Sequence, residues 1–104
     1  MSNPVVTSTI EIHTENGLHI RPAEALARLA NRFSSRLEIV YEKQRVDAKS
    51  IMEMLTLGAG QGATLQVEAC GDDAEAAIAA IANLVENNFE ANNGTPPTPK
   101  PTPS

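Results

Sequence analysis

The chain has 104 residues, enough for one small domain with a modest and largely aliphatic core. A net charge of −5 and a pI near 4.9 exclude a general nucleic-acid binder, which would carry a basic surface. The lone Cys70 excludes an internal disulfide and supplies no metal-site spacing, and no apolar run reaches membrane-spanning length. Because the N-terminus also lacks a signal-peptide pattern, we expect the protein in the cytoplasm, with no insertion into a membrane. We also expect it to be a monomer.

The first predicted element is a β-strand over residues 5–13, a stretch rich in β-branched side chains. Its alternation places Val6, Ile10 and Ile12 on one face. His13 falls on the opposite parity at the end of the run, and we interpret it as a solvent-facing residue.

The stretch from Asn16 to Ala23 joins this strand to a helix. Asn-Gly favours a turn because both residues tolerate positive φ. Pro22 suits the first turn of a helix, where a missing N–H costs nothing. The apolar pattern then predicts a helix to about Phe33, whose buried face comprises Pro22, Leu26, Leu29, Ala30 and Phe33.

His19 therefore lies at a helix N-terminus, two residues before Arg21. The amides of Ile20 and Arg21 precede the first intrahelical bonds, so an anion there would meet free N–H groups, the helix dipole and a guanidinium. This combination suits a histidine that carries a phosphate, because neutral imidazole is a nucleophile near pH 7. The residues alone leave a simpler alternative open, namely a surface histidine in a turn beside a solvated arginine.

Ser34-Ser35 ends this helix, and two further strands follow it. Leu37, Ile39 and Tyr41 alternate as the second strand, residues 42–44 form a polar turn, and a short third strand runs over residues 45–48.

Ser50 opens a short helix, where Ser50 and Glu53 match a capping box that satisfies two backbone amides reciprocally. The glycine-rich segment 58–62 ends this helix as a C-cap and turn. It is not a phosphate-binding P-loop, because no Gly-Lys-Ser/Thr follows it.

Leu65, Val67 and Ala69 alternate as a fourth strand. Asp72 and Glu75 are a candidate second cap for an alanine-rich helix from Ala74 to Ala91, which the sequence Asn-Asn-Gly at 92–94 stops. The apolar residues that this helix is predicted to bury are Ile78, Ile81, Leu84, Val85 and Phe89. We therefore divide the chain into a folded domain over residues 1–91 and a disordered Pro/Thr-rich tail over residues 92–104.

The order of elements is β-α-β-β-α-β-α, which predicts an α+β fold with one antiparallel sheet and helices on one side. Residues 17–23, which read GLHIRPA, resemble the active-site signature of the HPr family, the histidine phosphocarriers of the bacterial phosphoenolpyruvate-dependent sugar phosphotransferase system. Residues 48–58, which read AKSIMEMLTLG, resemble a second block of the same family at the expected separation. The resemblance spans residues 5–90 and implies the HPr fold, an open-faced sandwich of a four-stranded antiparallel sheet and three helices. Ile20 departs from the family, which more often has a small residue or threonine there.

The resemblance also implies a mechanism. His19, through Nδ1, would accept a phosphoryl group from phosphohistidine on Enzyme I and pass it to sugar-specific EIIA or EIIB components. Arg21 would stabilise the phosphoryl charge, and the backbone amides of Ile20 and Arg21 would donate to it. No metal or cofactor is required, and the chain would be a phosphoryl carrier rather than a stand-alone catalyst.

A partner surface is predicted around the two motif blocks, where apolar side chains lie beside basic ones. Methionine adapts to several partners, and a basic face can steer an acidic protein toward an acidic partner. The residues that we assign to this surface are Ile20, Arg28, Lys49, Ile51, Met52 and Leu55. For Met52 and Leu55 the alternative is plain core packing.

Ser50 has two interpretations. The helix cap alone explains this serine, whereas in the HPr family a serine at this place is phosphorylated by a dedicated ATP-dependent kinase in many bacteria. Three alternatives to a sugar-system carrier therefore stay open: a regulator acting through phosphorylated Ser50, a carrier of the nitrogen-related branch, and a small anion-binding adaptor without phosphotransfer.

Overall fold

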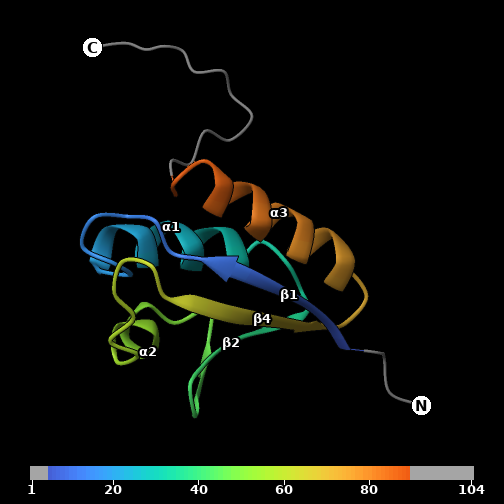
Figure 1. Ribbon diagram of the computed structural model, residues 1–104. Coiled ribbons are helices and arrows are strands. Elements are labelled where there is room, and N and C mark those ends of the chain that lie inside the picture. Colours follow the sequence, from blue (N-terminus) through green and yellow to red (C-terminus); the bar gives the residue numbers. More distant parts are fainter. Residues whose placement is uncertain (1–4, 90–104) are drawn as a thin grey trace, which may run out of the picture.

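The computed structural model describes residues 5–89, and the predicted Pro/Thr-rich tail lies outside the described residues. Seven elements alternate along the chain (Figure 1): β1 (Val5–Glu11), α1 (Ile20–Ala30), β2 (Arg36–Tyr41), β3 (Gln44–Asp47), α2 (Ile51–Leu55), β4 (Thr64–Cys70) and α3 (Ala74–Glu86). The predicted element order is therefore confirmed.

The four strands form one antiparallel sheet in the order β1-β4-β2-β3. β4, the last strand in sequence, lies between β1 and β2, with Ile10 opposite Leu65 and Ile39 opposite Val67. α1 and α3 cover one face of this sheet, and α2 packs against α1 and β3 (Figure 1). The expected open-faced sandwich is confirmed.

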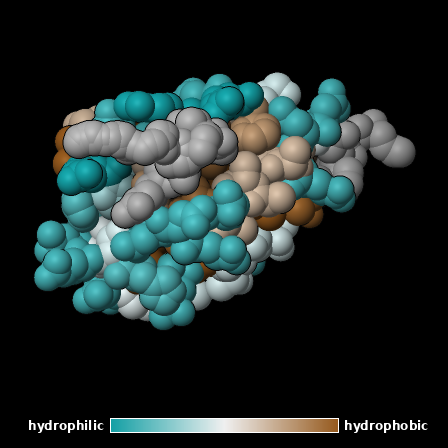
Figure 2. Space-filling model, turned by 90° about the horizontal axis from the view of Figure 1, so that it is seen from above, coloured by the Kyte–Doolittle hydropathy of each residue, from teal (hydrophilic) through white to brown (hydrophobic). Residues whose placement is uncertain are grey.

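The core lies between the sheet and the helices, where the inward-facing residues of each strand meet alanines and leucines of α1 and α3. Leu37, Ile39, Leu65 and Val67 are almost fully buried, as the alternation predicts. Seen from above, with α3 uppermost, the surface is largely hydrophilic and is interrupted by an apolar stretch (Figure 2).

β3 covers Gln44–Asp47, one residue earlier than predicted, and three other element ends differ from the predictions by more. β1 ends at Glu11, two residues early, although Ile12 remains buried and His13 is 62% exposed as expected. α1 ends at Ala30 rather than near Phe33, because the amides of Arg32 and Phe33 bond three residues back in tight turns.

The third difference is the end of α3, which is Glu86 rather than Ala91. Asn88 adopts a left-handed conformation (φ 58°), its N–H bonds to the Val85 carbonyl at 2.9 Å, and the N–H of Phe89 bonds to the Leu84 carbonyl at 2.8 Å. These two bonds form a Schellman motif. The predicted stop at 92–94 was wrong because asparagine supplied the C′ residue well before the first glycine.

The cap predicted from Asp72 and Glu75 was also wrong. Asp73 occupies the N-cap position of α3, and its side chain makes no capping bond. Its carboxylate instead accepts hydrogen bonds from the Ser34 and Ser35 amides, both at 2.9 Å, and from the Ser35 hydroxyl. The bond from the Ser35 hydroxyl, followed by those from the two amides, lowers the pKa of Asp73 from 3.8 to about 2.

Candidate functional site

His19 lies at the N-cap position of α1, held by a turn that packs against a distant loop. Its backbone is extended (φ −92°), and its carbonyl accepts the first helical bond, from the Ala23 amide at 3.0 Å. Gly17 has φ +72°, and a Cβ there would collide with the backbone of Ala59 and Gly60. The Leu18 amide donates to the Ala59 carbonyl at 2.9 Å. These contacts fix the direction in which the chain enters α1.

Two backbone donors follow His19 without a partner. Within residues 5–89, the amides of Ile20 and Arg21 donate to no other group, and Pro22 has no N–H to offer. The predicted free N–H groups are therefore present at the positive end of α1, where an anion is stabilised.

The two arginines of this helix face are in different states. The guanidinium of Arg28 pairs with Glu24 at 3.0 Å. The guanidinium of Arg21 bonds to no side chain or carbonyl among the described residues. Of these two arginines, Arg21 is therefore the one whose charge is available to an incoming anion.

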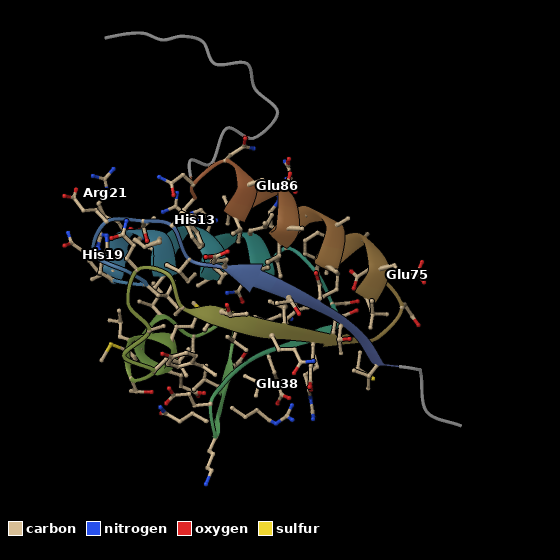
Figure 3. All side chains as sticks on the ribbon, in the orientation of Figure 1. His13, His19, Arg21, Glu38, Glu75 and Glu86 are labelled. Atoms are coloured by element: carbon tan, nitrogen blue, oxygen red, sulfur yellow. The ribbon has the colours of Figure 1, made fainter. Side chains whose placement is uncertain are left out.

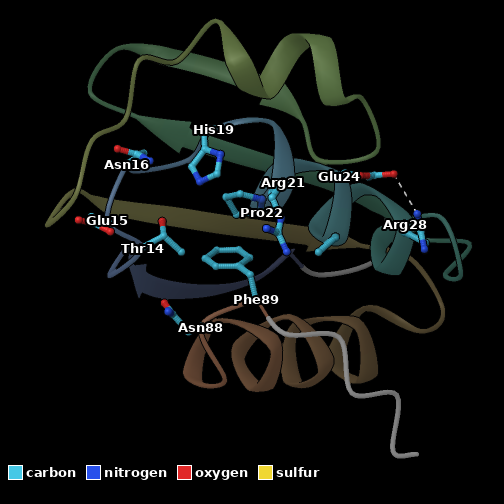
Figure 4. A pocket seen from close by; sticks show the side chains of 11 residues that line it. Thr14, Glu15, Asn16, His19, Arg21, Pro22, Glu24, Arg28, Asn88 and Phe89 are labelled. Atoms are coloured by element: carbon cyan, nitrogen blue, oxygen red, sulfur yellow. Dashed lines mark hydrogen bonds and ion pairs between the residues drawn. The ribbon is translucent and has the colours of Figure 1, made fainter. Parts of the chain in front are cut away.

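A cleft of about 540 Å³ lies beside His19 (Figure 4). One wall is the α1 face that carries Arg21, and another comes from the residues just after α3. The residues that line it are Thr14, Glu15, Asn16, His19, Arg21, Pro22, Glu24, Ala25, Arg28, Asn88 and Phe89. His19 and Arg21 lie together at one end of the molecule (Figure 3). The cleft therefore brings together an imidazole and a guanidinium, and the two amides without a partner among residues 5–89 directly follow His19 in the chain.

The predicted partner surface is only partly exposed. Ile20 and Met52 are 60% and 74% exposed, whereas Ile51 and Leu55 are half-buried against the core. Lys49 is half-buried, and its ammonium donates to the Phe33 carbonyl at 2.8 Å. The two exposed apolar residues of this region are thus Ile20 of α1 and Met52 of α2.

Ser50 caps α2, and its Oγ accepts a hydrogen bond from the Glu53 amide at 3.2 Å. The reciprocal half of the predicted capping box was wrong. The Glu53 carboxylate accepts from the Asp47 amide at 2.9 Å, while the Ser50 amide donates to the Asp47 carbonyl. The Ser50 amide already donates to the Asp47 carbonyl in the turn after β3, so it does not need the Glu53 carboxylate as an acceptor. The Glu53 carboxylate binds the Asp47 amide instead.

Sequence reasoning missed three contributors to the cleft. Thr14 lines it, and its hydroxyl donates to the Gly17 carbonyl at 2.5 Å. Glu24 pairs with Arg28, a contact that their spacing of four residues on one helix could have indicated. Phe89 was interpreted as a buried helix residue, and no local signal placed it beside α1. Within residues 5–89, no cluster of His, Cys, Asp or Glu side chains is arranged to hold a metal ion.

Comparison with known proteins identifies the class to which this fold and site belong. The family model described as "PTS HPr component phosphorylation site" matches residues 6–87. The phosphocarrier protein HPr of Treponema pallidum is 38% identical over 86 residues, which cover 83% of this chain and 98% of that protein. The chain belongs to the HPr family, the phosphocarriers of the phosphotransferase system.

Solved structures agree with this assignment. HPr of Thermoanaerobacter tengcongensis superposes with a TM-score of 0.78 at 42% identity, covering 81% of this chain and 94% of that one. An HPr dimer from the same organism gives a TM-score of 0.66 at 43% identity, covering 79% and 94%.

One relative is a larger protein. The phosphoryl donor subunit DhaM of the PEP-dependent dihydroxyacetone kinase of Providencia stuartii is 36% identical over 94 residues. The match covers 90% of this chain and 20% of that protein.

Proposed function

We propose that this protein carries a phosphoryl group on His19, received from phospho-Enzyme I and delivered to sugar-specific EIIA or EIIB components. The observation that carries the proposal is the position of His19 before two amides, and beside an arginine, that have no partner among residues 5–89. Family membership supports the same role. A carrier of this kind would meet its donor and acceptors in the cytoplasm, and we expect this chain there.

In the transfer step, the lone pair of His19 Nδ1 attacks the phosphorus of the donor phosphohistidine. The new N–P bond forms as the old one breaks, and the donor imidazole keeps the electron pair. The phosphoryl charge is then met by the guanidinium of Arg21 and by the amides of Ile20 and Arg21. These donors are in place before the phosphoryl group arrives, so little reorganisation is needed.

The partner surface in this proposal consists of Ile20 and Met52, which are exposed, with Ile51 and Leu55 supporting them. Arg28 would add net positive charge only if binding of a partner breaks its ion pair with Glu24. Lys49 would add positive charge to this surface. Its bond to the Phe33 carbonyl also holds the segment before α2 in position. Ser50 is a candidate site of regulatory phosphorylation by an HPr kinase, at a helix start where added negative charge is tolerated.

The similarity to the DhaM subunit favours a second candidate, a carrier that serves a kinase system with the same chemistry on His19. A carrier of the nitrogen-related branch would also use the same site. A mainly regulatory protein would depend on Ser50 instead and would not need His19.

The test is to incubate the protein with phosphoenolpyruvate and Enzyme I and to measure acid-labile phosphate on the protein. We expect label on the wild type and on His13→Ala, which serves as the matched control, and none on His19→Ala. An unlabelled wild type would favour the anion-binding adaptor, and a labelled His19→Ala variant would show that another residue is the nucleophile.

A further inference from the structure

β1 is a free edge of the sheet. In the order β1-β4-β2-β3 it pairs with β4 alone, and no backbone bond joins its other side to any residue of the range 5–89. Just after β1, both backbone groups of Ile12 bond to the segment before β4, at 2.9 and 2.7 Å. Backbone groups alternate in direction along a strand, so every second residue back from Glu11 directs its N–H and C=O away from β4. The residues whose groups point to the free side are Val5, Thr7, Thr9 and Glu11.

The two edges of the sheet differ in their protection against further pairing. The opposite edge, β3, has four residues, two of which are the charged Arg45 and Asp47, and α2 packs against it. β1 has seven residues, and from Val5 to Ile10 it contains no charge, proline or glycine. Short strands, edge charges and prolines are the features that prevent edge-to-edge pairing. Of these features, β1 has only one charge, at its last residue.

A second copy of this chain matches the free edge. If a two-fold axis passes through Ser8, two β1 strands run antiparallel and all seven residues of each are paired. Thr7 of one copy then lies opposite Thr9 of the other, and Val5 lies opposite Glu11. These are the residues whose N–H and C=O groups point outward, so each such pair can exchange two hydrogen bonds. A shift of one residue would place outward groups opposite inward ones.

The side chains are compatible in this register. Thr7 opposite Thr9 is a favourable cross-strand pair, and Val6 meets Ile10 on the face toward the helices. Although each chain has a net charge of −5, no like charges lie opposite each other between the two strands. The one charged residue of β1, Glu11, would be about 20 Å from its copy, a distance at which salt screens the repulsion.

A groove beside the free edge adds apolar surface. It has a volume of about 150 Å³ and lies between β1 and α3. Its lining includes Ile10, Ala82 and Val85, together with Thr9 and Glu11, whose side chains lie on the face of the sheet opposite α3. Because the groove touches both α3 and these two residues, it opens at the free edge. A strand added there would therefore also cover apolar atoms.

We propose that β1 is a self-association edge, at which two copies of this chain pair antiparallel about Ser8 and join their sheets into one. The Pro/Thr-rich tail is a poor occupant of the edge, because five of the ten residues 95–104 are proline and have no N–H to donate. The surface covered is small, so the dimer is weak and reversible. This inference departs from the monomer expected from the sequence. It does not depend on the proposed function, since no residue of β1 lines the cleft beside His19.

The test is sedimentation equilibrium of the full chain at concentrations from about 10 μM to about 1 mM, the range of weak complexes. We expect the apparent mass to rise above the 11.1 kDa of one chain. Thr7→Pro removes an outward N–H but no bond to β4, and it should weaken association about tenfold or more because the dimer loses two hydrogen bonds. Thr7→Val keeps the N–H and is the matched control. A wild type that stays monomeric, or a Thr7→Pro variant that associates as strongly as Thr7→Val, would overturn the proposal.

Oxidative cross-linking tests the register without weakening the edge. In a Cys70→Ser background, Ser8→Cys should form a disulfide-linked dimer, because facing residues of a non-hydrogen-bonded pair have Cα atoms about 4.5 Å apart. Thr9→Cys in the same background should not, since Thr9 lies opposite Thr7 rather than its own copy. Thermal melts check that each variant is folded. Equal cross-linking of the two variants, or none in Ser8→Cys, would refute the placement of the axis at Ser8.

Discussion

Replacing Ser50 by alanine and by aspartate separates its capping role from its electrostatic one. The Oγ of Ser50 accepts one hydrogen bond, from the Glu53 amide at 3.2 Å. Alanine removes this bond and should cost about 1 kcal/mol of unfolding free energy, the usual size of an N-cap. For a domain of this length, that loss lowers the melting temperature by ~4–8 °C.

Aspartate caps as well as serine, so Ser50→Asp should stay nearer to the wild type in a thermal melt. It also adds a negative charge beside Ile51 and Met52, on the proposed partner surface. If Enzyme I presents an acidic surface there, His19 phosphorylation should slow by roughly tenfold, whereas Ser50→Ala should react at nearly the wild-type rate.

The assay is the rate of His19 phosphorylation by Enzyme I for the three proteins, repeated at low and high ionic strength. Salt should reduce the gap between the aspartate and alanine variants, because the interaction is between charges near the surface. Equal rates at low salt would refute the electrostatic reasoning and leave Ser50 as a helix cap only.

Three further results are expected. Arg21→Ala should lower the transfer rate by ~10²-fold or more with little change in melting temperature, because its guanidinium supports no bond within the described fold; a normal rate would remove Arg21 from the mechanism. Deleting residues 95–104 should change neither the melting temperature nor phosphoryl acceptance, and a fall in either would show that the tail docks. Asp73, whose folded pKa is lowered from 3.8 to about 2, stabilises the fold above pH 4 and loses that contribution as pH falls toward 2. Asp73→Asn should therefore show a smaller loss of stability than the wild type between pH 4 and pH 2 in acid-titration melts, and equal slopes would contradict this.

Local sequence patterns were sufficient to predict the helices and strands, but not to predict how they are arranged in space. Alternation identified the inward residues of β2 and β4, because side chains on a strand point to opposite faces. The insertion of β4 between β1 and β2 has no local signal, and no strand order was predicted from the sequence. The end of α3 was misplaced because Asn88 can adopt the conformation normally expected of glycine.

The site was predictable where its parts are adjacent in sequence. His19, Arg21 and the free amides arise from one turn and the helix it begins, so their spacing was enough to propose an anion site. Phe89 reaches the same cleft from the other end of the domain, and nothing in its neighbourhood indicates that destination. The same limit applies to Asp73, whose bonds to Ser34 and Ser35 span 38 or 39 residues.

The attachment of the His19 turn to the loop after α2 determines how this site responds to local unfolding. The Leu18 amide bonds to Ala59, and Ile12 exchanges bonds with Ala63 and Gly62 at 2.9 and 2.7 Å, which continues the pairing of β1 with β4. The turn thus belongs to the same cooperative unit as the two strands, rather than to a loop that frays independently. Hydrogen exchange at Leu18 should then follow the global opening of the sheet, while the neighbouring amides of Ile20 and Arg21 exchange freely. The protected Leu18 amide and the accessible amides of Ile20 and Arg21 therefore lie within three residues of one another in the chain.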